Sequence, residues 1–222
     1  MTKEKNSWHN LFMHTHQFHH FMCFSLVLLL SSVWGGVAMA DELPPSWAKL
    51  QLPFKESTIK RLRKGDTYAK ASLSKTDKKG EKKFSFAAAG WHQRNCATAL
   101  PRLAQYERYN HYLPFVAEST YQEASQIIDL VFKVWIIPFT LELRFKLPRI
   151  SKVGSYPFVF EEGFLPDLHG AVNVQDVDDR CLILITANWQ GPDPEINAFL
   201  FEMFAQTAGT IGMEKMLRAT RD

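Results

Sequence analysis

Three histidines are the first candidates for chemistry after residue 40: His92, His111 and His169. None of them has a second histidine or a cysteine at the spacing that zinc sites use. The sequence has no glycine-rich phosphate loop, because Gly209 and Gly212 fall inside a helical pattern. It also has no Gly-x-Ser-x-Gly motif that would present a nucleophile. We therefore predict no metal site, no cofactor and no catalytic residue.

Four further polar side chains could work inside a cavity: Asp129, Glu142, Arg144 and His169. The first three alternate with apolar residues along predicted strands, so strand geometry turns them away from the apolar face. We expect solvated or ion-paired surface residues, with a role inside a cavity as the alternative. This pattern favours binding over catalysis.

The composition fits one globular domain with an aromatic-rich interior. The chain has 222 residues, of which 46% are hydrophobic and 22% charged, and it contains 17 Phe, 6 Trp and 6 Tyr. This length corresponds to one domain, with or without a targeting segment. The formal net charge of +3 is too small for the basic face that nucleic-acid binding requires. We expect no nucleic-acid partner, and the sequence does not determine the oligomeric state.

Residues 1–40 have the features of a signal peptide. Two early lysines precede an apolar run at residues 24–34, and the run is followed by an A-M-A sequence that ends at Ala40. Signal peptidase recognises small residues at the two alanine positions of such a sequence. We predict cleavage near Ala40 and a periplasmic or secreted protein. The alternative is an uncleaved anchor, although the apolar run is shorter than the roughly 20 residues that cross a bilayer.

Export changes the interpretation of the cysteines. Cys23 would leave with the signal peptide, whereas Cys96 and Cys181 would remain. An even pair in an oxidising compartment is a candidate disulfide. Two buried free thiols are the alternative, and the spacing alone does not decide between them.

The next two segments are an entry region and a basic hairpin. Residues 41–56 contain three prolines and are predicted to be irregular. Residues 57–83 are rich in lysine and arginine, and a D-K-K-G turn signal at 77–80 predicts a hairpin with a cationic tip. Such a charge run is commonly a solvated face, and attraction to an anionic membrane is the functional alternative. The lysines expected to face a membrane are Lys75, Lys78, Lys79, Lys82 and Lys83.

Helical and strand patterns then follow one another. Residues 94–110 show helical spacing interrupted at Pro101, which predicts two short helices. The strict apolar–polar alternation over residues 139–147 is typical of an antiparallel strand with one buried face. Further strands are predicted at residues 67–74, 82–91, 128–136, 156–164, 171–177 and 180–190.

The chain closes with a long helical pattern. A proline-containing break at residues 191–194 precedes an apolar stripe typical of an amphipathic helix. The stripe consists of Ile196, Phe199, Leu200, Met203, Phe204, Thr207 and Ile211. Strands, two short helices and this long helix together predict an α+β fold.

One segment carries a family resemblance. The sequence YERYNHYLPFV at residues 106–116 resembles the "DYERYPEYLPFV"-like signature of the START-like (SRPBCC) superfamily, in its polyketide cyclase/dehydrase and coenzyme-Q-binding branch. Gln105 replaces the aspartate of that signature. The resemblance implies a START-like domain at residues 57–222 with a helix-grip fold. In that fold a curved antiparallel sheet wraps around a long C-terminal helix, and two short helices follow the first core strand.

The resemblance also bears on the cysteine pair. In the helix-grip fold the first strand pairs antiparallel with the last, which would bring the region of Trp91 beside Arg180. Cys96 and Cys181 lie just beyond these two strand ends. The resemblance therefore implies a disulfide between them.

A ligand cavity is the functional implication of the same resemblance, because helix-grip proteins commonly leave space between sheet and helix. Without the resemblance, the apolar residues between sheet and helix would be interpreted as an ordinary hydrophobic core. We expect a binding module for a hydrophobic small molecule, such as a lipid, an isoprenoid quinone or a polyketide-like compound. The alternatives are a cyclase or aromatase and an interaction protein with a filled core. The residues predicted to contact the ligand are Phe132, Val134, Leu141, Leu143, Phe145, Phe158, Phe160, Phe199 and Met203.

Overall fold

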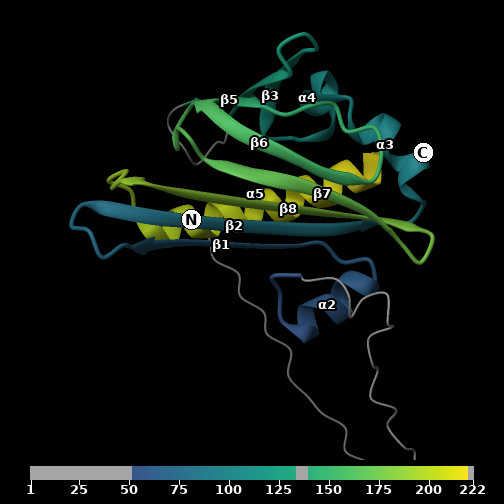
Figure 1. Cartoon of the computed structure of the whole chain (residues 1–222), viewed down its shortest axis with the longest axis horizontal. Coiled ribbons are helices and arrows are strands. Elements are labelled where there is room, and N and C mark those ends of the chain that lie inside the picture. The colour runs from purple at the N-terminus through teal and green to yellow at the C-terminus, as the bar shows by residue number, and fades with distance from the viewer. Residues whose placement is uncertain (1–51, 134–139, 220–222) are drawn as a thin grey trace, which may run out of the picture. The chain divides into compact units, whose positions relative to one another are not determined.

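The computed structural model describes residues 52–133 and 140–219. Within these residues the strands form one antiparallel sheet of eight strands, in the order β1-β2-β8-β7-β6-β5-β4-β3 (Figure 1). The strands are β1 (Tyr68–Lys75), β2 (Glu81–His92), β3 (Val116–Gln122), β4 (Ile127–Phe132), β5 (Leu141–Lys146), β6 (Gly154–Glu162), β7 (His169–Val177) and β8 (Arg180–Pro192).

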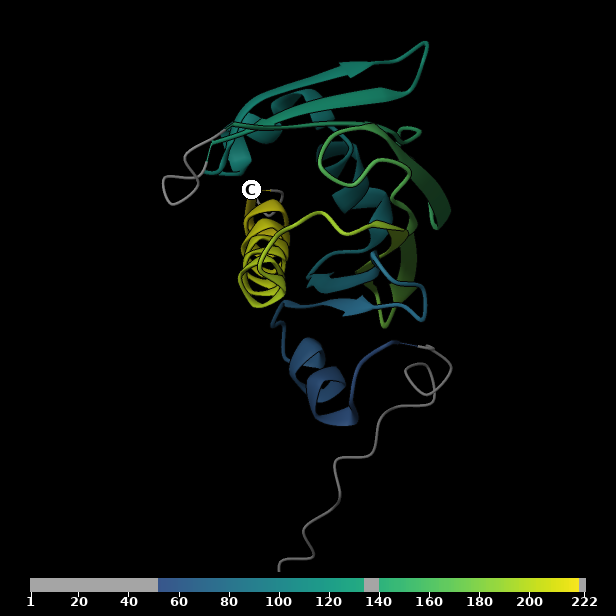
Figure 2. The same cartoon turned by 90° about the vertical axis from the view of Figure 1, so that its left-hand side faces the viewer.

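Helices lie on both faces of the sheet. The long helix α5 lies along the concave face, around which the strands curve (Figure 2). The short helix α2 packs on the opposite face, against residues such as Ala89 and Trp91 that alternate with the inward-facing Ala88. The helices are α2 (Glu56–Arg63), α3 (Cys96–Leu103), the 3-10 turn η1 (Tyr106–Arg108), α4 (Tyr109–Tyr112) and α5 (Ala198–Ala219). The predicted α+β helix-grip architecture is confirmed.

The predicted pairing of the first core strand with the last is also confirmed. Strand β2 pairs with β8 so that Trp91 lies opposite Leu182 and His92 opposite Cys181. This register brings the start of α3 to the start of β8. Cys96 and Cys181 form a disulfide there, with 4.6 Å between their Cα atoms. The implied disulfide is therefore present, and it fastens α3 to the sheet.

The position of α5 is set by contacts with β1, the edge strand of the sheet. The Leu73 N–H donates a hydrogen bond to Glu202 Oε1 at 2.6 Å, and Gln206 Nε2 donates to the Ala71 carbonyl at 3.3 Å. These bonds use backbone groups of β1 that have no neighbouring strand. Gly209 permits the close approach, because a Cβ atom there would lie only 2.7 Å from Phe86 Cζ. The helix is thus anchored at one margin of the sheet.

Two local features differ from the sequence prediction. A helix, α2, forms at Glu56–Arg63, where only polar and basic sequence was recognised. Its Ile59 and Leu62 supply the buried side, which is too short an apolar pattern to be distinctive. Helix α3 also continues through Pro101 to Leu103 instead of stopping there. A proline costs such a short helix only one backbone hydrogen bond.

Parts of the predicted organisation lie outside the described residues. The signal peptide at 1–40 and most of the entry segment at 41–56 belong to this group. Within the part that is described, no helix is both long and apolar enough to cross a membrane.

Candidate functional site

A cavity of about 370 Å³ lies between the concave face of the sheet and α5. Six of the eight strands contribute inward-facing side chains, and α3, η1, α4, α5 and several connecting loops complete the wall within the described residues. Its volume falls in the range of roughly 300–1,000 Å³ that small-molecule sites occupy. The cavity lies in the concavity of the sheet, because α5 is anchored over β1 and β2 at one margin while the other strands curve around the space beside it (Figure 2).

The sheet side of the cavity is aromatic. Phe145 of β5 stacks on Phe160 of β6 with 5.1 Å between ring centroids, and Phe158 lies 6.0 Å from Phe160. These rings face inward together because β5 and β6 pair with Phe145 opposite Phe160. Phe158 and Phe160 are two residues apart and so share one face of β6. The three rings form a continuous apolar surface that a flat or chain-like ligand can contact.

The helix side of the cavity is formed by one stripe of α5. Phe201 packs against Phe84 of β2 at 5.1 Å and against Phe164 at 5.4 Å between ring centroids. Smaller residues follow on the same stripe, including Ala205 and Ala208. Large rings therefore lie at the start of α5, and small side chains leave space along its middle.

Two phenols are the main polar groups of the described wall. The Tyr106 hydroxyl donates to the Pro148 carbonyl at 3.1 Å and accepts the Ile150 N–H at 3.1 Å. The Tyr109 hydroxyl donates to the Leu103 carbonyl at 2.9 Å. Both hydroxyls are therefore committed to backbone groups. They join η1 to the segment after β5 and α4 to α3, and do not offer a free donor to a ligand.

Burial makes these phenols harder to ionise. Desolvation raises the pKa of Tyr106 well above its ordinary value, and it raises the pKa of Tyr109 in the same direction. The nearby Arg149 guanidinium opposes this shift but does not overcome it. Since no Asp, Glu, Lys, Arg or His belongs to the described lining, this part of the wall carries no charge at neutral pH.

Most of the predicted ligand contacts line the cavity, and the sequence placed two of them wrongly. The side chains of Phe199 and Met203 are 70% and 47% exposed and lie on the outer side of α5. The error is one of helix phase: α5 is apolar around most of its circumference, so the stripe chosen from the sequence was not the inward one. Val134 lies outside the described residues. The predicted residues that do line the cavity are Phe132, Leu141, Leu143, Phe145, Phe158 and Phe160.

Several lining residues were not recognised from the sequence. In β2, Phe84 and Phe86 alternate with Ser85, a signal that could have identified them. The inward residues of α5, Phe201 and Ala205, had no such signal because apolar neighbours surround them.

The polar candidates lie away from the cavity, as strand parity predicted. Arg144 Nε bonds Asp129 Oδ1 at 2.7 Å, and its Nη1 lies 3.4 Å from Glu162 Oε1. These hydrogen bonds and charges raise the pKa of Arg144. Neither Glu142 nor His169 lines the cavity. Among the described residues, no cluster of His, Cys, Asp and Glu could hold a metal ion.

The predicted lysine-rich hairpin forms from β1 and β2. Gly80 closes its turn with a φ of +81°, a conformation that glycine adopts readily. Lys78 Nζ lies 3.6 Å from Glu81 Oε1, and Lys82 Nζ lies 3.1 Å from Asp193 Oδ1. Lys82, through a hydrogen bond, lowers the pKa of Asp193. The second of these pairs connects the hairpin to the segment that leads into α5.

Comparison with known proteins identifies the fold. No family model matches the sequence, and no curated protein matches it. The Zhui aromatase/cyclase from a Streptomyces species aligns with a TM-score of 0.50 and 13% identity, covering 62% of this chain and 93% of that one. A conserved protein from Geobacillus kaustophilus aligns with a TM-score of 0.51 and 9% identity, covering 61% of this chain and 94% of that one.

A STAR-related lipid transfer protein from Xanthomonas axonopodis is also similar, with a TM-score of 0.46 and 14% identity, covering 68% of this chain and 99% of that one. At such identities a structural likeness shows the fold alone. The two structures with TM-scores of 0.50 and 0.51 share the helix-grip fold of this chain, which is the fold expected from the segment at residues 106–116.

Proposed function

We propose that this chain is an exported binding module that encloses an apolar small molecule between the sheet and α5. The observation that carries the proposal is the cavity of about 370 Å³, whose described wall is apolar apart from two phenols already bonded to backbone carbonyls. Apolar pockets with few polar groups are typical of small-molecule sites. The ligand class that fits is a lipid acyl chain, an isoprenoid or a similarly apolar ring system.

The wall also limits what can enter. A polar ligand group buried without a hydrogen-bond partner costs roughly 2–7 kcal/mol, depending on the reference state. Neither Tyr106 nor Tyr109 offers a free donor inside. A polar head would therefore remain at the opening of the cavity, with the apolar part inside.

Neither alternative function fits the cavity as well. A cyclase or aromatase needs an acid or base beside the substrate, and the described lining contains neither a carboxylate nor an imidazole. His92, the one buried histidine among the described residues, is the last residue of β2 and does not line the cavity. An interaction protein with a filled core would not leave this volume between sheet and helix.

Export and membrane contact belong to the proposal on the strength of the sequence. The signal-like segment ending near Ala40 supports export, and the disulfide between Cys96 and Cys181 suits an oxidising compartment. The lysine hairpin supports peripheral contact with an anionic membrane.

Native mass spectrometry tests the binding proposal. The whole chain is expressed in a bacterium and purified without detergent, and its native mass is compared with its denatured mass. We expect an excess mass that solvent extraction recovers as an apolar compound. The denatured mass also reports whether the chain starts after Ala40.

Two variants in α5 make this test specific. Ala208→Trp places an indole in the cavity, and we expect it to lose the bound mass. Thr207→Trp adds the same bulk at the neighbouring exposed position and should keep it. Equal ligand content in both variants, or a bare chain in the wild type, would refute binding in this cavity.

A further inference from the structure

The start of α5 carries three large apolar side chains on the outside of the protein. The exposed fractions are 70% for Phe199, 55% for Leu200 and 47% for Met203. Phe199 and Met203 are four residues apart, so they are neighbours on one side of the helix, with Leu200 beside them. Single exposed apolar residues are common, but an adjacent group of this kind marks an interaction site. We call these three residues the α5 patch.

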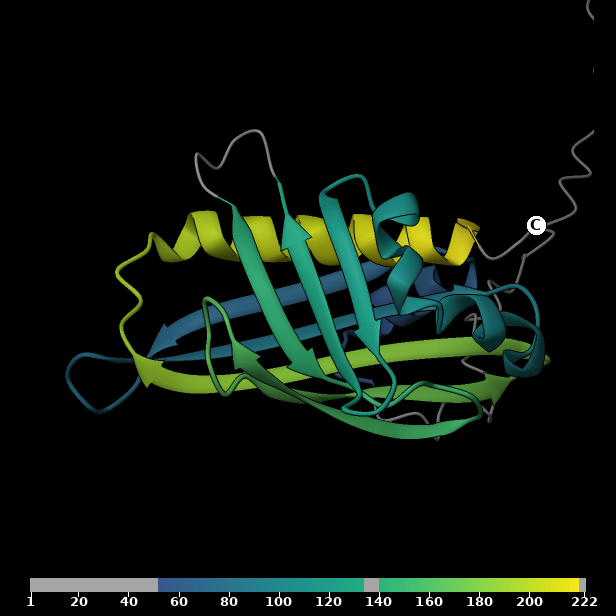
Figure 3. The ribbon, with the colours of Figure 1, turned by 90° about the horizontal axis from the view of Figure 1, so that it is seen from above.

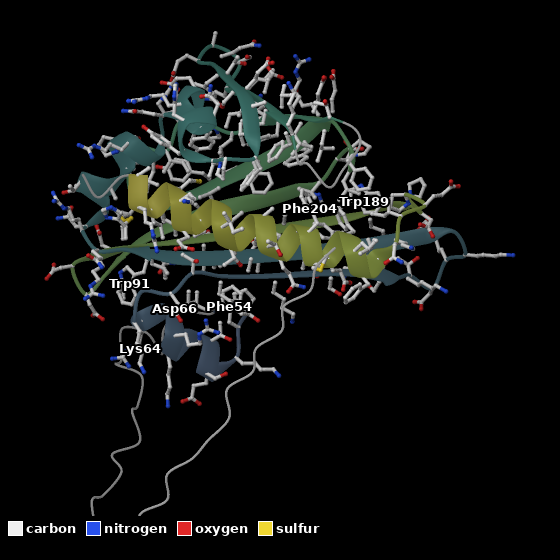
Figure 4. All side chains as sticks on the ribbon, turned by 180° about the vertical axis from the view of Figure 1, so that it is seen from behind. Phe54, Lys64, Asp66, Trp91, Trp189 and Phe204 are labelled. Atoms are coloured by element: carbon white, nitrogen blue, oxygen red, sulfur yellow. A yellow bond between two sulfur atoms is a disulfide. The ribbon has the colours of Figure 1, made fainter. Side chains whose placement is uncertain are left out.

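The α5 patch continues into the wall of the cavity. Leu200 and Phe204 are one helical turn apart, and Phe204 lines the cavity. Figure 4 shows Phe204 on this part of α5, at the same end of the sheet as Trp189. An apolar ligand that leaves the cavity past Phe204 would therefore meet the α5 patch before it meets charged surface.

The lysine hairpin lies at the same end of the protein. Its turn is bonded to the segment before α5, because the Asp193 N–H donates to the Gly80 carbonyl at 2.8 Å. The ion pair between Lys82 and Asp193 holds the two segments together. Figure 3 shows the tip of the hairpin and the start of α5 at the same end of the sheet, on the left.

The free charge on these two segments is positive. Within the described residues, the exposed Lys75, Lys79 and Lys83 form no ion pair. The same two segments contain two acids without an ion pair, Asp77 and Glu195, so the excess of positive charge is small. It would strengthen contact with an anionic surface, whereas the apolar side chains would supply most of the affinity.

We propose that the α5 patch, flanked by the lysine hairpin, docks on an anionic lipid bilayer and so brings the cavity to the membrane. The occupant is a bilayer because the uncharged patch runs directly into an apolar cavity and lysines border it. This inference rests on the proposed function, since it explains how an apolar ligand would enter and leave without crossing water.

Vesicle co-sedimentation of the whole chain tests the proposal. The vesicles are phosphatidylcholine with or without phosphatidylglycerol. We expect binding that strengthens several-fold with the anionic lipid. The variant F199S/L200S/M203S should weaken binding by about tenfold or more, because it removes three apolar side chains from the contact. The control V153S/V159S removes two exposed valines located elsewhere and should bind like the wild type.

Native mass spectrometry of the same proteins separates this inference from the proposed function. A patch variant that keeps its bound mass and loses vesicle binding supports the docking surface. Equal vesicle binding by wild type and patch variant overturns the docking surface, whatever the ligand content. A dimer that the wild type forms and the patch variant does not form would also overturn it, because the patch would then contact a second copy of the chain. Vesicle binding that depends on the patch in a ligand-free wild type would support docking and refute only the ligand proposal.

Discussion

A helix packs on each face of the sheet, but the two contacts differ in how completely side chains fill the space between helix and sheet. On the convex face, α2 places Ile59 and Leu62 against Trp91 and Leu182, and all four side chains are buried in one apolar cluster. On the concave face, the much longer α5 covers a cavity of about 370 Å³. Figure 4 labels Phe54 and Trp91 of the convex cluster, which lie on the α2 side of β1 and β2.

The difference follows from where each helix is anchored. Helix α2 lies directly on the strands that it covers, so its side chains fill the space beneath it. Helix α5 is bonded to the edge strand β1 through Glu202 and Gln206, and Gly209 brings it close to Phe86. The rest of the sheet curves around the space beside the helix (Figure 2). The cavity therefore arises here from anchoring a helix at one margin of a curved sheet, not from a shortage of apolar side chains.

The covalent link is found on the concave side. The disulfide closes a loop of 85 residues and fastens α3, which covers one end of the cavity. The cross-link therefore fixes part of the cavity wall to the sheet.

Removing the disulfide should have the largest effect. We expect C96S/C181S to lower the free energy of unfolding by about 4 kcal/mol, because the cross-linked loop is long. Denaturant unfolding of the oxidised wild type and the variant measures this. Hydrogen exchange should show lost protection in α3 before α2. Equal loss in both helices would mean that the cross-link serves the whole domain and does not distinguish the two faces.

Leucine truncations on the two faces should differ in cost. Leu62→Ala on the convex face should lower the free energy of unfolding by about 3 kcal/mol, since it opens a void in a filled contact. Leu143→Ala in the cavity wall should cost about 1 kcal/mol, because that side chain already borders empty space. Denaturant unfolding measures both variants. Leu62→Ala should leave the bound mass unchanged, so it also serves as the stability control for ligand loss. Similar costs would indicate that the cavity is filled in solution.

Much of this comparison could be read from the sequence. Period-two alternation located the strands, and β5 was the clearest because Leu141, Leu143 and Phe145 alternate with charged residues. The turn at residues 77–80 located the hairpin. The segment at residues 106–116 indicated the fold, and through the fold the register that joins Cys96 to Cys181.

The phase of α5 could not be read in this way. The first turns of this helix are apolar on most sides. Its polar residues Glu202 and Gln206 do not mark the outward face, because both bond the edge strand β1. Its orientation depends on contacts with a strand more than a hundred residues away in the sequence, such as Leu73 with Glu202. Helix α2 was missed for a related reason, because two apolar residues do not establish a period.

The smallest expected difference between the two faces concerns how stability changes at alkaline pH. Tyr106 and Tyr109 lie on the cavity side, and burial raises the pKa of both above the ordinary value of 10.0. The folded protein therefore keeps protons that the unfolded chain releases. Their contribution to stability is fully present below pH 10 and is lost as pH rises above it, by about 1 kcal/mol per pH unit for each tyrosine.

Denaturant unfolding at a series of alkaline pH values measures this slope. Tyr106→Phe removes one titrating group and should make the slope shallower, at a cost of about 1 kcal/mol at neutral pH for the hydrogen bonds to Pro148 and Ile150. Leu62→Ala should shift the whole curve downward without changing the slope, because the convex contact contains no buried phenol among its core residues. If Tyr106→Phe left the alkaline slope unchanged, the phenol would be open to water, and the cavity side would be less enclosed than its hydrogen bonds indicate.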